Sequence, residues 1–430
     1  MTSRYYLWTV GCQMNKADSE KLAAGFQRIG LKATDRMERA DIVVLNTCSV
    51  RQHAEDRAYS KLGRIRELKK ANPGLKVAVM GCMVGLKTDD LRKRFPQVDA
   101  FARPQQFEPI MELIEGPRED LGGEFWPTTC AIPEGPTAFV PVVHGCNKFC
   151  TYCIVPYRRG REKSRPMAEI LREVASLAAN GVREVTLLGQ TVEAYGHDLP
   201  GLPDLGDLMR ALSDIERLER IRFLTSYPKD MTDRILEAIA ELPKVMECFS
   251  LPVQAGSDRV LDSMRRGYTR AEYLEKIAEV RALMPGAGIT TDVIVGYPGE
   301  TEADFEETLS LLEEVRFDKV HVAAYSPRPG TIAYRTMADD VPAATKAGWL
   351  HRVEAMENRI SREINETYVG TVQEILVEGM RGEQPFGRTR TGKLVHLDAP
   401  ARIGSMVDVR IEHAGPFALR GMPVDALVLA

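Results

Sequence analysis

The chain has 430 residues, of which 44% are hydrophobic and 27% are charged, and its formal net charge is -4 at pH 7. This composition is typical of a globular protein with two or three domains, and it excludes a strongly basic nucleic-acid-binding chain, so any basic surface must be local. The first residues lack the pattern of a signal peptide, and no run of about 18 apolar residues occurs. We therefore expect a cytoplasmic protein that does not span a membrane.

Residues 1–115 are predicted to form an α/β domain around a parallel sheet, because short apolar runs alternate with charged segments of helical periodicity. Strands are expected at residues 5–10, 41–46 and 76–80, and helices at residues 17–29 and 54–70. A cysteine closely follows each strand: Cys12, Cys48 and Cys82. Because the carboxyl ends of parallel strands face one crevice, these three thiols should lie near one another.

Two interpretations of these cysteines remain open. Each one alone is typical of a small buried hydrophobic residue, since free cysteine is among the most buried residue types. Their shared position at strand ends favours a three-cysteine metal site instead. Gly11 and Gly81 precede two of the cysteines and would let the backbone approach a ligand closely.

Two further cysteines are not interpreted as ligands. Residues 116–137 are rich in glycine, proline and acids and are predicted to form a linker, in which Cys130 has no partner at a metal-binding spacing. Cys248 lies in an apolar run and is interpreted as a core residue.

Residues 138–366 are predicted to form a partial or full parallel barrel of six strand and helix units. The expected strands are residues 138–143, 184–188, 220–225, 248–253, 290–295 and 319–325. Function concentrates at the carboxyl ends of such strands, where Gln190, Ser226 and Gln254 are candidates, although any one of them could simply end its strand. Asp292 lies inside a strand, so it either faces the barrel mouth or makes a buried hydrogen bond.

The first of these strands leads into the segment HGCNKFCTYCIVP, in which Cys146, Cys150 and Cys153 have the spacing C-x3-C-x2-C. Three thiolates this close can hold three irons of a 4Fe-4S cluster and leave the fourth iron open to a chelating cofactor. Zinc sites built from cysteine usually contain two C-x2-C pairs or histidine partners, and neither arrangement occurs here. The spacing therefore favours an iron–sulfur cluster.

Residues 367–430 follow a helix predicted at 343–366 and are expected to form a small antiparallel barrel, because apolar and polar residues alternate in short runs. The expected strands are residues 371–377, 393–397 and 406–411.

Two local basic clusters are candidates for contact with a nucleic acid. One begins shortly after Cys153, and the other lies in one loop of the carboxyl-terminal barrel. Their members are Arg158, Arg159 and Arg161 in the first cluster, and Arg388, Arg390 and Lys393 in the second. An ordinary solvated surface would have the same pattern.

Longer motifs extend across nearly the whole chain. They read GCQMNKADSEKLA, LNTCSVR, MGCM, GCNKFCTYCIVPYRRGRE, LLGQTVEAYG, LPVQAGSDRVLDSMRRGYTR and TTDVIVGYPGETEADF. Together with the aromatic Tyr152 before the last triad cysteine, they resemble the radical S-adenosylmethionine methylthiotransferases, specifically the MiaB type that modifies tRNA. The resemblance implies an amino-terminal cluster domain, a radical barrel and a carboxyl-terminal TRAM module.

The same resemblance implies S-adenosylmethionine and two 4Fe-4S clusters as cofactors. Cys146, Cys150 and Cys153 would hold the cluster that binds S-adenosylmethionine, and Cys12, Cys48 and Cys82 would hold an auxiliary cluster. The S-adenosylmethionine or substrate pocket would contain Tyr152, Gln190, Ser226, Gln254 and Asp292.

The activity implied by the resemblance is methylthiolation of C2 of N6-isopentenyladenosine next to the tRNA anticodon. S-adenosylmethionine would be both the methyl donor and the source of a 5′-deoxyadenosyl radical. The expected partners are the anticodon stem-loop and a small electron-donor protein such as flavodoxin or ferredoxin, and the chain is expected to be a monomer.

Other functions remain open at this point. Sibling enzymes methylthiolate threonylcarbamoyl-adenosine in tRNA or an aspartate of a ribosomal protein, although the GCQMN opening and the triad motif favour the isopentenyladenosine enzyme. A non-catalytic iron–sulfur RNA-binding protein and a zinc-stabilised scaffold are alternatives of other classes. His144, Thr191 and Ser250 depart from the family pattern, which has Glu, Asn and His at these positions.

Overall fold

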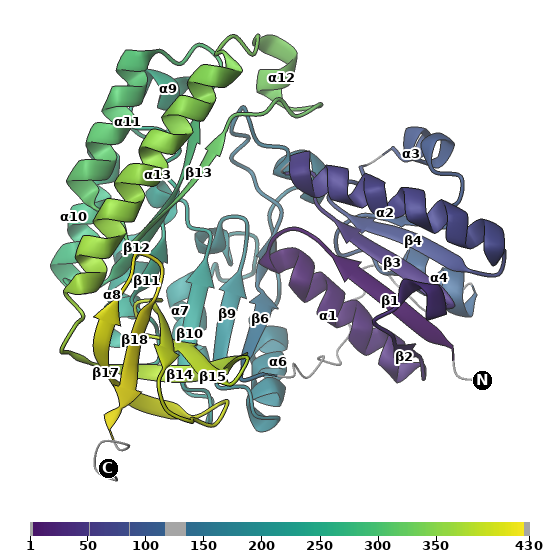
Figure 1. The fold of residues 1–430 in the computed structure, drawn as a ribbon, viewed down its shortest axis with the longest axis horizontal. Helices are drawn as coiled ribbons and strands as arrows, with labels where there is room; N and C mark the ends of the chain where they lie inside the picture. Colours follow the sequence, from purple (N-terminus) through teal and green to yellow (C-terminus); the bar gives the residue numbers. More distant parts are fainter. Residues whose placement is uncertain (1–2, 51, 86, 117–134, 425–430) are drawn as a thin grey trace.

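The computed structural model describes residues 3–50, 52–85, 87–116 and 135–424. In Figure 1 an amino-terminal sheet (purple to blue) lies beside a central set of strands and helices (teal to green), and a small carboxyl-terminal barrel (yellow) lies below it. Most of the predicted linker, including Cys130, lies outside the described residues. Within the described ranges, no helix is both long and apolar enough to cross a membrane.

The amino-terminal sheet has five parallel strands in the order β2-β1-β3-β4-β5. Its strands are β1 (Arg4–Thr9), β2 (Lys32–Ala33), β3 (Ile42–Thr47), β4 (Lys76–Gly81) and β5 (Ala100–Ala102). The accompanying helices are α1 (Gln13–Arg28), α2 (Gln52–Ala71), α3 (Asp89–Arg94), α4 (Glu108–Glu115) and the 3-10 turn η1 (Met37–Arg39). The three predicted strands are confirmed, and β2 and β5 are short additions at the two edges.

Both faces of this sheet are covered, which explains why β3 is apolar along most of its length. Val43 and Leu45 pack with α2 on one face, whereas Ile42 and Val44 pack with α1 and α4 on the other. Parallel sheets generally need such cover on both sides. The carboxyl ends of the strands stay uncovered by these helices and point towards the central strands (Figure 1).

The central region contains six parallel strands in two groups, β10-β9-β6 and β11-β12-β13. The strands are β6 (Thr137–Pro141), β9 (Glu184–Leu188), β10 (Arg220–Leu224), β11 (Cys248–Ser250), β12 (Gly288–Val295) and β13 (Lys319–Ala324). One bridge between Ile221 and Val245 joins the groups. Among the described residues β13 does not pair with β6, so the barrel is partial.

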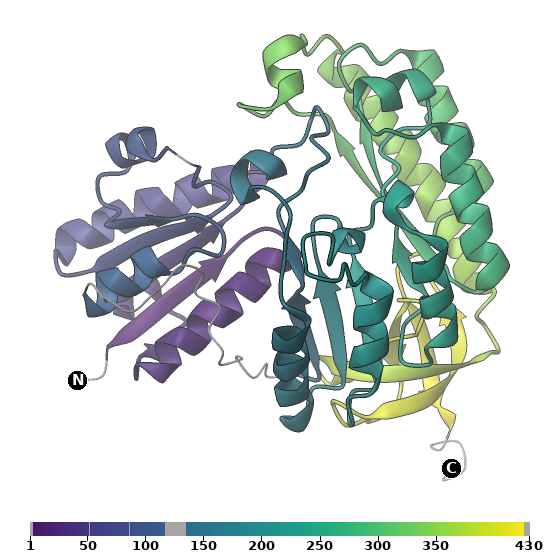
Figure 2. The same cartoon turned by 180° about the vertical axis from the view of Figure 1, so that it is seen from behind.

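Helices cover the outside of this partial barrel, as Figure 2 shows from behind. They are α6 (Met167–Ala179), α7 (Leu205–Ser213), α8 (Asp233–Glu241), α10 (Arg270–Leu283), α11 (Glu302–Val315) and α13 (Ala343–Glu366). Shorter elements are β7 (Val143–His144), β8 (Lys163–Ser164), α5 (Val155–Arg159), α9 (Asp258–Ser263), α12 (Ile332–Thr336), η2 (Val192–Ala194) and η3 (Pro228–Asp230). The helix predicted at 343–366 is confirmed with the same bounds.

The carboxyl-terminal residues form a closed barrel in the order β14-β15-β16-β18-β17. Its strands are β14 (Val372–Arg381), β15 (Gln384–Arg388), β16 (Leu394–Leu397), β17 (Met406–Ala414) and β18 (Leu419–Pro423). Adjacent strands are antiparallel except β16 and β18, which run parallel. Alternate residues such as Ile375, Val377 and Val409 form its core, as the alternation in the sequence predicts.

Helix α1 joins the amino-terminal sheet to the central strands. Met14 and Ala17 pack on Leu188 at the end of β9. Beside them, Glu173 of α6 pairs with Lys21 of α1 at 3.7 Å and with Arg165 at 2.6 Å, and all three side chains are nearly buried. The open carboxyl ends of the two sheets are thereby held face to face.

Candidate active site

The carboxyl ends of the two sheets enclose a cavity of about 310 Å³. Its wall contains both three-cysteine sets: Cys12, Cys48 and Cys82 from the amino-terminal sheet, and Cys146, Cys150 and Cys153 from the loop after β7. The expectation that the first three thiols share a crevice is confirmed. That this crevice also contains the second set could not be read from spacing, because it depends on how the two sheets dock.

Two buried asparagines position the loops that bear Cys12 and Cys48. The Asn15 side-chain amide donates to the carbonyl oxygens of Val10 and Thr47, each at 2.9 Å. The Asn46 amide in turn donates to the Asn15 carbonyl at 2.7 Å. The loops that follow β1 and β3 are therefore tied to the start of α1, where Cys12 precedes the first helical residue. We did not single out either asparagine from the sequence.

Gly11 and Gly81 allow these loops to pack against one another. Gly81 has φ +94°, and a Cβ there would lie 2.4 Å from the Thr47 carbonyl oxygen. Gly11 has φ +129°, and a Cβ there would lie 2.9 Å from the Cβ of Cys48. Both contacts are impossibly short, so only glycine fits. The close approach expected from the sequence is thus to a neighbouring loop, which brings the cysteines together.

The second triad sits on a tight loop with its own constraints. The Cys146 amide donates to the Gly160 carbonyl at 3.1 Å, and a Cβ on Gly145 would lie 1.9 Å from the Arg161 carbonyl oxygen. Between the cysteines, the Thr151 hydroxyl donates to the Ser263 carbonyl at 3.0 Å. The loop is fixed from both sides, so the three thiols hold a preset orientation.

The chemistry of the six thiols fits sites in which they would bind iron. None of the six forms a disulfide, and burial raises the pKa of Cys82 to about 11 and that of Cys153 to about 12. These thiols therefore stay protonated near pH 7 unless metal binding drives their deprotonation. Within the described residues no group of three or more His, Cys, Asp and Glu side chains is arranged so that it could hold a single metal ion, whereas a four-iron cluster takes its thiolates from more widely spaced positions.

Arg266 is a buried cation beside the second triad that our reading of the sequence missed. Its Nη1 donates to the Cys150 Sγ at 3.4 Å and to the Tyr152 hydroxyl at 3.4 Å, and its Nη2 donates to the Pro252 carbonyl at 2.8 Å. Only 5% of Arg266 is exposed. Its sequence context, SMRRGYTR, offers two adjacent arginines, and nothing local indicates which one turns inward.

The predicted pocket residues all lie on the wall of this cavity. They are Tyr152, Gln190, Ser226, Gln254 and Asp292. Asp292 therefore faces the barrel mouth, one of its two expected positions. That these residues contact a cofactor stays a prediction.

The three positions that depart from the family pattern lie near the site. The Thr191 hydroxyl is 3.7 Å from the Cys146 Sγ, and Thr191 lines the cavity. The Ser250 carbonyl accepts from the Ser226 amide at 3.0 Å, and His144 ends β7 two residues before Cys146. The exchange at position 191 is therefore the one that directly contacts a triad cysteine.

A second cavity of about 480 Å³ adjoins the first and shares Tyr152, Gln254 and Asp292 with it. Val50 forms part of its wall on the amino-terminal side, and Tyr325 does so on the β13 side. This space lies between the two sheets and is large enough for a planar base.

The first basic cluster is not a uniform surface. Arg161 is exposed and stacks on the Phe149 ring at 4.5 Å. Arg159 is buried and bonded to α1, and Arg158 is partly buried, with its carbonyl accepting from Arg103 at 3.2 Å. The polyanion contact expected of all three is therefore wrong for Arg159, because its side chain is inaccessible.

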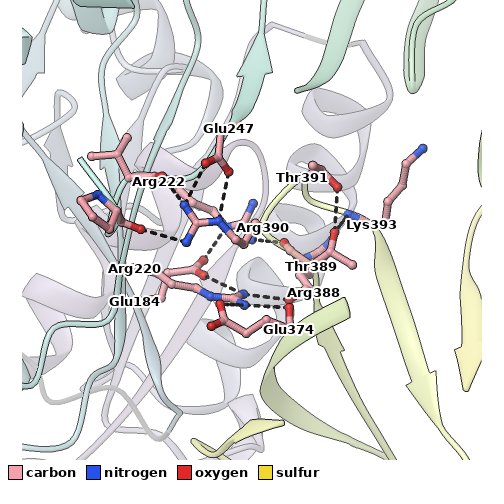
Figure 3. Close-up of polar contacts among 12 residues, drawn as sticks. Glu184, Arg220, Arg222, Glu247, Glu374, Arg388, Thr389, Arg390, Thr391 and Lys393 are labelled. Atoms are coloured by element: carbon pink, nitrogen blue, oxygen red, sulfur yellow. Dashed lines mark hydrogen bonds and ion pairs between the residues drawn. The ribbon is translucent and has the colours of Figure 1, made fainter. Parts of the chain in front are cut away.

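The second basic cluster makes contacts within the chain, and Figure 3 shows those of Arg390 with Glu247. Arg390 donates to Glu247 at 2.9 Å and to the Pro243 carbonyl at 2.8 Å, and Lys393 pairs with Asp318 at 2.6 Å. Arg388 pairs with Glu378 at 3.4 Å. Arg390 and Lys393 therefore join the carboxyl-terminal barrel to the central strands, in place of the nucleic-acid contact that the sequence suggested.

The same interface contains two buried arginines from the first half of β10 (Figure 3). Arg220 donates to the carbonyls of Arg388 at 2.8 Å and Glu374 at 2.9 Å, and its side chain is 1% exposed. Arg222 donates to the Thr389 carbonyl at 2.8 Å and to Glu184 at 2.6 Å. The small barrel thus closes the amino ends of the central strands, opposite the cavity.

Comparison with known proteins agrees with this division of the chain. Residues 4–102 match an uncharacterized protein family, UPF0004, residues 140–312 match the Radical SAM superfamily, and residues 366–424 match the TRAM domain. Among solved structures, the radical S-adenosylmethionine methyltransferase TsrM from Kitasatospora setae has a TM-score of 0.57 at 14% identity, covering 87% of this chain and 77% of that one. This likeness shows the shared fold.

Relatives of known name match over nearly the full length. A tRNA-2-methylthio-N(6)-dimethylallyladenosine synthase from Dehalococcoides mccartyi (strain CBDB1) is 45% identical over 98% of this chain and 99% of its own. The protein of the same name from Chloroflexus aurantiacus is also 45% identical, over 98% of this chain and 91% of its own. Our chain therefore belongs to the family of tRNA-2-methylthio-N(6)-dimethylallyladenosine synthases, which are radical S-adenosylmethionine methylthiotransferases.

Proposed function

We propose that this protein attaches a methylthio group to C2 of N6-isopentenyladenosine next to the anticodon of tRNA. The observation that carries the proposal is the single cavity lined by both three-cysteine sets. The names of the relatives support this substrate over threonylcarbamoyl-adenosine or a ribosomal-protein aspartate.

Two cofactor sites follow from the two triads. Membership of the radical S-adenosylmethionine family implies one 4Fe-4S cluster with S-adenosylmethionine, which we assign to Cys146, Cys150 and Cys153. We assign an auxiliary 4Fe-4S cluster to Cys12, Cys48 and Cys82. When bound, these groups supply the methyl group, the sulfur and the 5′-deoxyadenosyl radical that removes hydrogen from an unactivated carbon.

The side chains of the cavity bind and orient these groups. Gln190, Gln254 and Asp292 offer polar groups to S-adenosylmethionine or to the target base. The Tyr152 ring packs against the apolar core, and the rings of Tyr227 and Tyr268 stack around Arg266 and limit the access of water to this wall. Excluding water protects a radical from side reactions and strengthens local electrostatics.

The adjoining cavity offers a place for the target base. Val50 and Tyr325 line it on opposite sides, so a base that enters it lies between the amino-terminal and central strands. Reaching this position requires the base to leave the stack of its loop. Exposed Arg161 beside the second triad is suited to a phosphate of the same loop.

We also propose that one chain suffices, because both triads line a cavity made by a single chain. The electron donor would be a small protein such as flavodoxin or ferredoxin, and a tRNA substrate is consistent with a cytoplasmic location.

Anaerobic turnover tests the proposal. Reconstituted protein, reductant, S-adenosylmethionine and an isopentenylated anticodon stem-loop should give methylthiolated product by mass spectrometry, and about eight irons per chain by assay. If only a threonylcarbamoyl-adenosine stem-loop gave product, the protein would instead belong with the sibling enzymes that methylthiolate that nucleoside. Zinc in place of iron, or no 5′-deoxyadenosine, would favour a structural role.

Substitutions in the two triads should have different effects on the products. Cys150→Ala should abolish formation of 5′-deoxyadenosine, because it removes a ligand of the cluster assigned to S-adenosylmethionine. Cys48→Ala should leave this cleavage detectable and stop sulfur insertion. Both products are measured by liquid chromatography and mass spectrometry, and an equal loss of cleavage in the two variants would refute the assignment.

A further inference from the structure

Arg159 belongs to the polypeptide of the second triad, yet its side chain lies at the first. It ends the short helix α5, which begins two residues after Cys153. Its Nη2 donates to Asn15 Oδ1 at 2.8 Å and lies 3.3 Å from Asp18 Oδ2, both on α1. The side chains of Arg159 and Asp18 are 2% and 0% exposed. Arg159 therefore crosses from one sheet assembly to the other within the protein interior.

One donor of this guanidinium makes no hydrogen bond of ordinary geometry to a described residue, although the Cys82 thiol lies close enough to interact with the guanidinium. Nη1 of Arg159 is buried and has no hydrogen-bond partner among the described residues. Leaving a buried charged donor without a partner is energetically unfavourable, so such groups usually mark a missing ligand or a functional role. Asp18 Oδ1 also lacks a hydrogen-bond partner among the described residues, so Arg159 Nη1 and Asp18 Oδ1 do not bond to each other.

The missing acceptor should lie in the cavity. Arg159 lines it together with Cys12, Cys48 and Cys82. Asn15 Oδ1 and Asp18 Oδ2 already accept from Nη2, so the atoms that remain in front of Nη1 are those of the cysteine site. Sulfur bound to iron is a good acceptor for an N–H group, and such bonds help to set the potential of a cluster.

We infer that Arg159 is a positioning residue of the auxiliary site, where its Nη1 donates to a sulfur atom of the cluster held by Cys12, Cys48 and Cys82. The inference rests on the proposed auxiliary cluster. An adjacent guanidinium favours the more negative, reduced form of a cluster, so Arg159 raises its reduction potential. Asp18 and Asn15 hold the guanidinium in place, much as second partners orient metal-binding side chains.

The contact also links the two triads mechanically. The backbone of the Cys153 loop continues into α5, and Arg159 at the end of α5 bonds to Asn15. Asn15 in turn holds the carbonyls of Val10 and Thr47, next to the loops that bear Cys12 and Cys48. A shift of the second triad is therefore transmitted to the first through this one side chain.

The test uses the full chain with Cys146, Cys150 and Cys153 changed to Ala, which leaves only the proposed auxiliary cluster. Arg159→Gln and Arg159→Lys are added to this parent, and the exposed Arg161→Gln is the matched control. Iron content and an electron paramagnetic resonance redox titration are measured. We expect about four irons per chain and a more negative midpoint potential for Arg159→Gln. Arg159→Lys should shift less, and Arg161→Gln should not shift.

Each outcome has a distinct meaning. A parent that holds no iron would refute the proposed auxiliary cluster. A parent with iron and an unchanged potential in both Arg159 variants would refute the inference. Loss of iron in Arg159→Gln with an unchanged melting temperature supports the inference, because Arg159 then serves the cluster. A loss of iron that is matched by a lower melting temperature would overturn the inference, because Arg159 would then act only on the stability of the fold.

Discussion

Arg266 stabilises the wall behind the second triad as well as facing Cys150. Its guanidinium lies 4.8 Å from the Tyr227 ring centre and donates to the Pro252 carbonyl and the Tyr268 hydroxyl. Several buried acceptors therefore depend on one cation. This concentration of contacts makes Arg266 a sensitive position for folding.

Arg266→Gln should lower the free energy of unfolding by about 2–4 kcal/mol, because these buried acceptors lose their donor. Denaturant unfolding of the anaerobic, metal-free protein measures the change. Arg265→Gln, at the exposed neighbouring residue, should change stability by less than about 0.5 kcal/mol. Equal losses in the two variants would contradict the assignment.

Glu193 gives the protein a pH dependence. It is 1% exposed, burial raises its pKa to about 7, and its Oε1 has no hydrogen-bond partner among the described residues. Because the pKa in the folded state exceeds that in the unfolded state, the folded protein holds this proton longer. The contribution of Glu193 to the free energy of unfolding is therefore highest below about pH 4.5, and it is lost as the pH rises to about 7.

Glu193→Gln should remove this loss. Relative to the unsubstituted protein, the free energy of unfolding should rise by about 2 kcal/mol more at pH 8 than at pH 5.5. This value follows from about 1.4 kcal/mol for each unit by which the pKa is raised. Thermal unfolding of the metal-free protein at the two pH values measures it. Glu237→Gln, at an exposed site on α8, should have the same small effect at both. A gain independent of pH would argue against a raised pKa at Glu193.

At the scale of single residues, the sequence predicts the positions of the six cysteines better than their surroundings. The six cysteines are recognisable because their spacing and strand-end positions are local. Arg159 and Arg266 are not, because their partners Asn15 and Cys150 lie 144 and 116 residues away along the chain. Local charge suggested a surface role for Arg159, whereas its burial depends on the docking of α1.

The turns after the amino-terminal strands show how a whole element depends on one small residue. Gly81 ends β4 with φ +94°, and its α-carbon faces the Thr47 carbonyl and the Asn46 side chain. Any side chain would push β4 away from the loop after β3. The position of Cys82 relative to Cys48 would change with it.

Gly81→Ala should destabilise the metal-free protein by about 2–4 kcal/mol and reduce its iron content after reconstitution. Gly63→Ala is the matched control, because Gly63 lies in α2 with no atom within 4 Å of an added Cβ. That change should be neutral or stabilise by up to about 1 kcal/mol. Similar losses at both positions would show that the contact at Gly81 is unimportant.

The elements themselves follow from apolar patterns where these are long. The strands of the two parallel sheets and helix α13 were predicted from them. Strands β2 and β5 have two and three residues, too short for a pattern, and β15 reads QPFGR, in which proline and glycine hide a strand. The strand expected at 248–253 ends at Ser250, because regular pairing stops there. Gln254, which has φ +77°, bridges to Val293 of β12 on its own.

At the scale of the whole molecule, the TRAM barrel is bonded to the central strands through Arg220, Arg222 and Arg390 (Figure 3). The order of the modules is evident from the sequence. Their placement is not, since it depends on pairs such as Arg390 with Glu247, whose charges also suit a solvated surface. The RNA contact predicted for this loop is therefore not supported at Arg390 and Lys393, whereas at the exposed Arg388 it stays a prediction.

Arg390→Ala should lower the melting temperature and leave the salt dependence of stem-loop binding unchanged, because Arg390 bonds to the protein. Fluorescence anisotropy at several salt concentrations measures it. A phosphate contact would instead reduce the slope of log K against log salt by about 1. The exposed Arg161→Ala serves as comparison and should show that reduction. A smaller slope of log K against log salt for Arg390→Ala would show that Arg390 does contact a phosphate of the RNA.

The cavity and the TRAM barrel occupy opposite ends of the central strands. Strand β12, with eight residues, separates these ends by about 25 Å. An RNA that touches both must run along the outside of the partial barrel for this distance. An RNA shorter than this distance can contact the cavity or the barrel, but not both. Simultaneous contact with the two ends therefore sets a minimum length for the bound RNA.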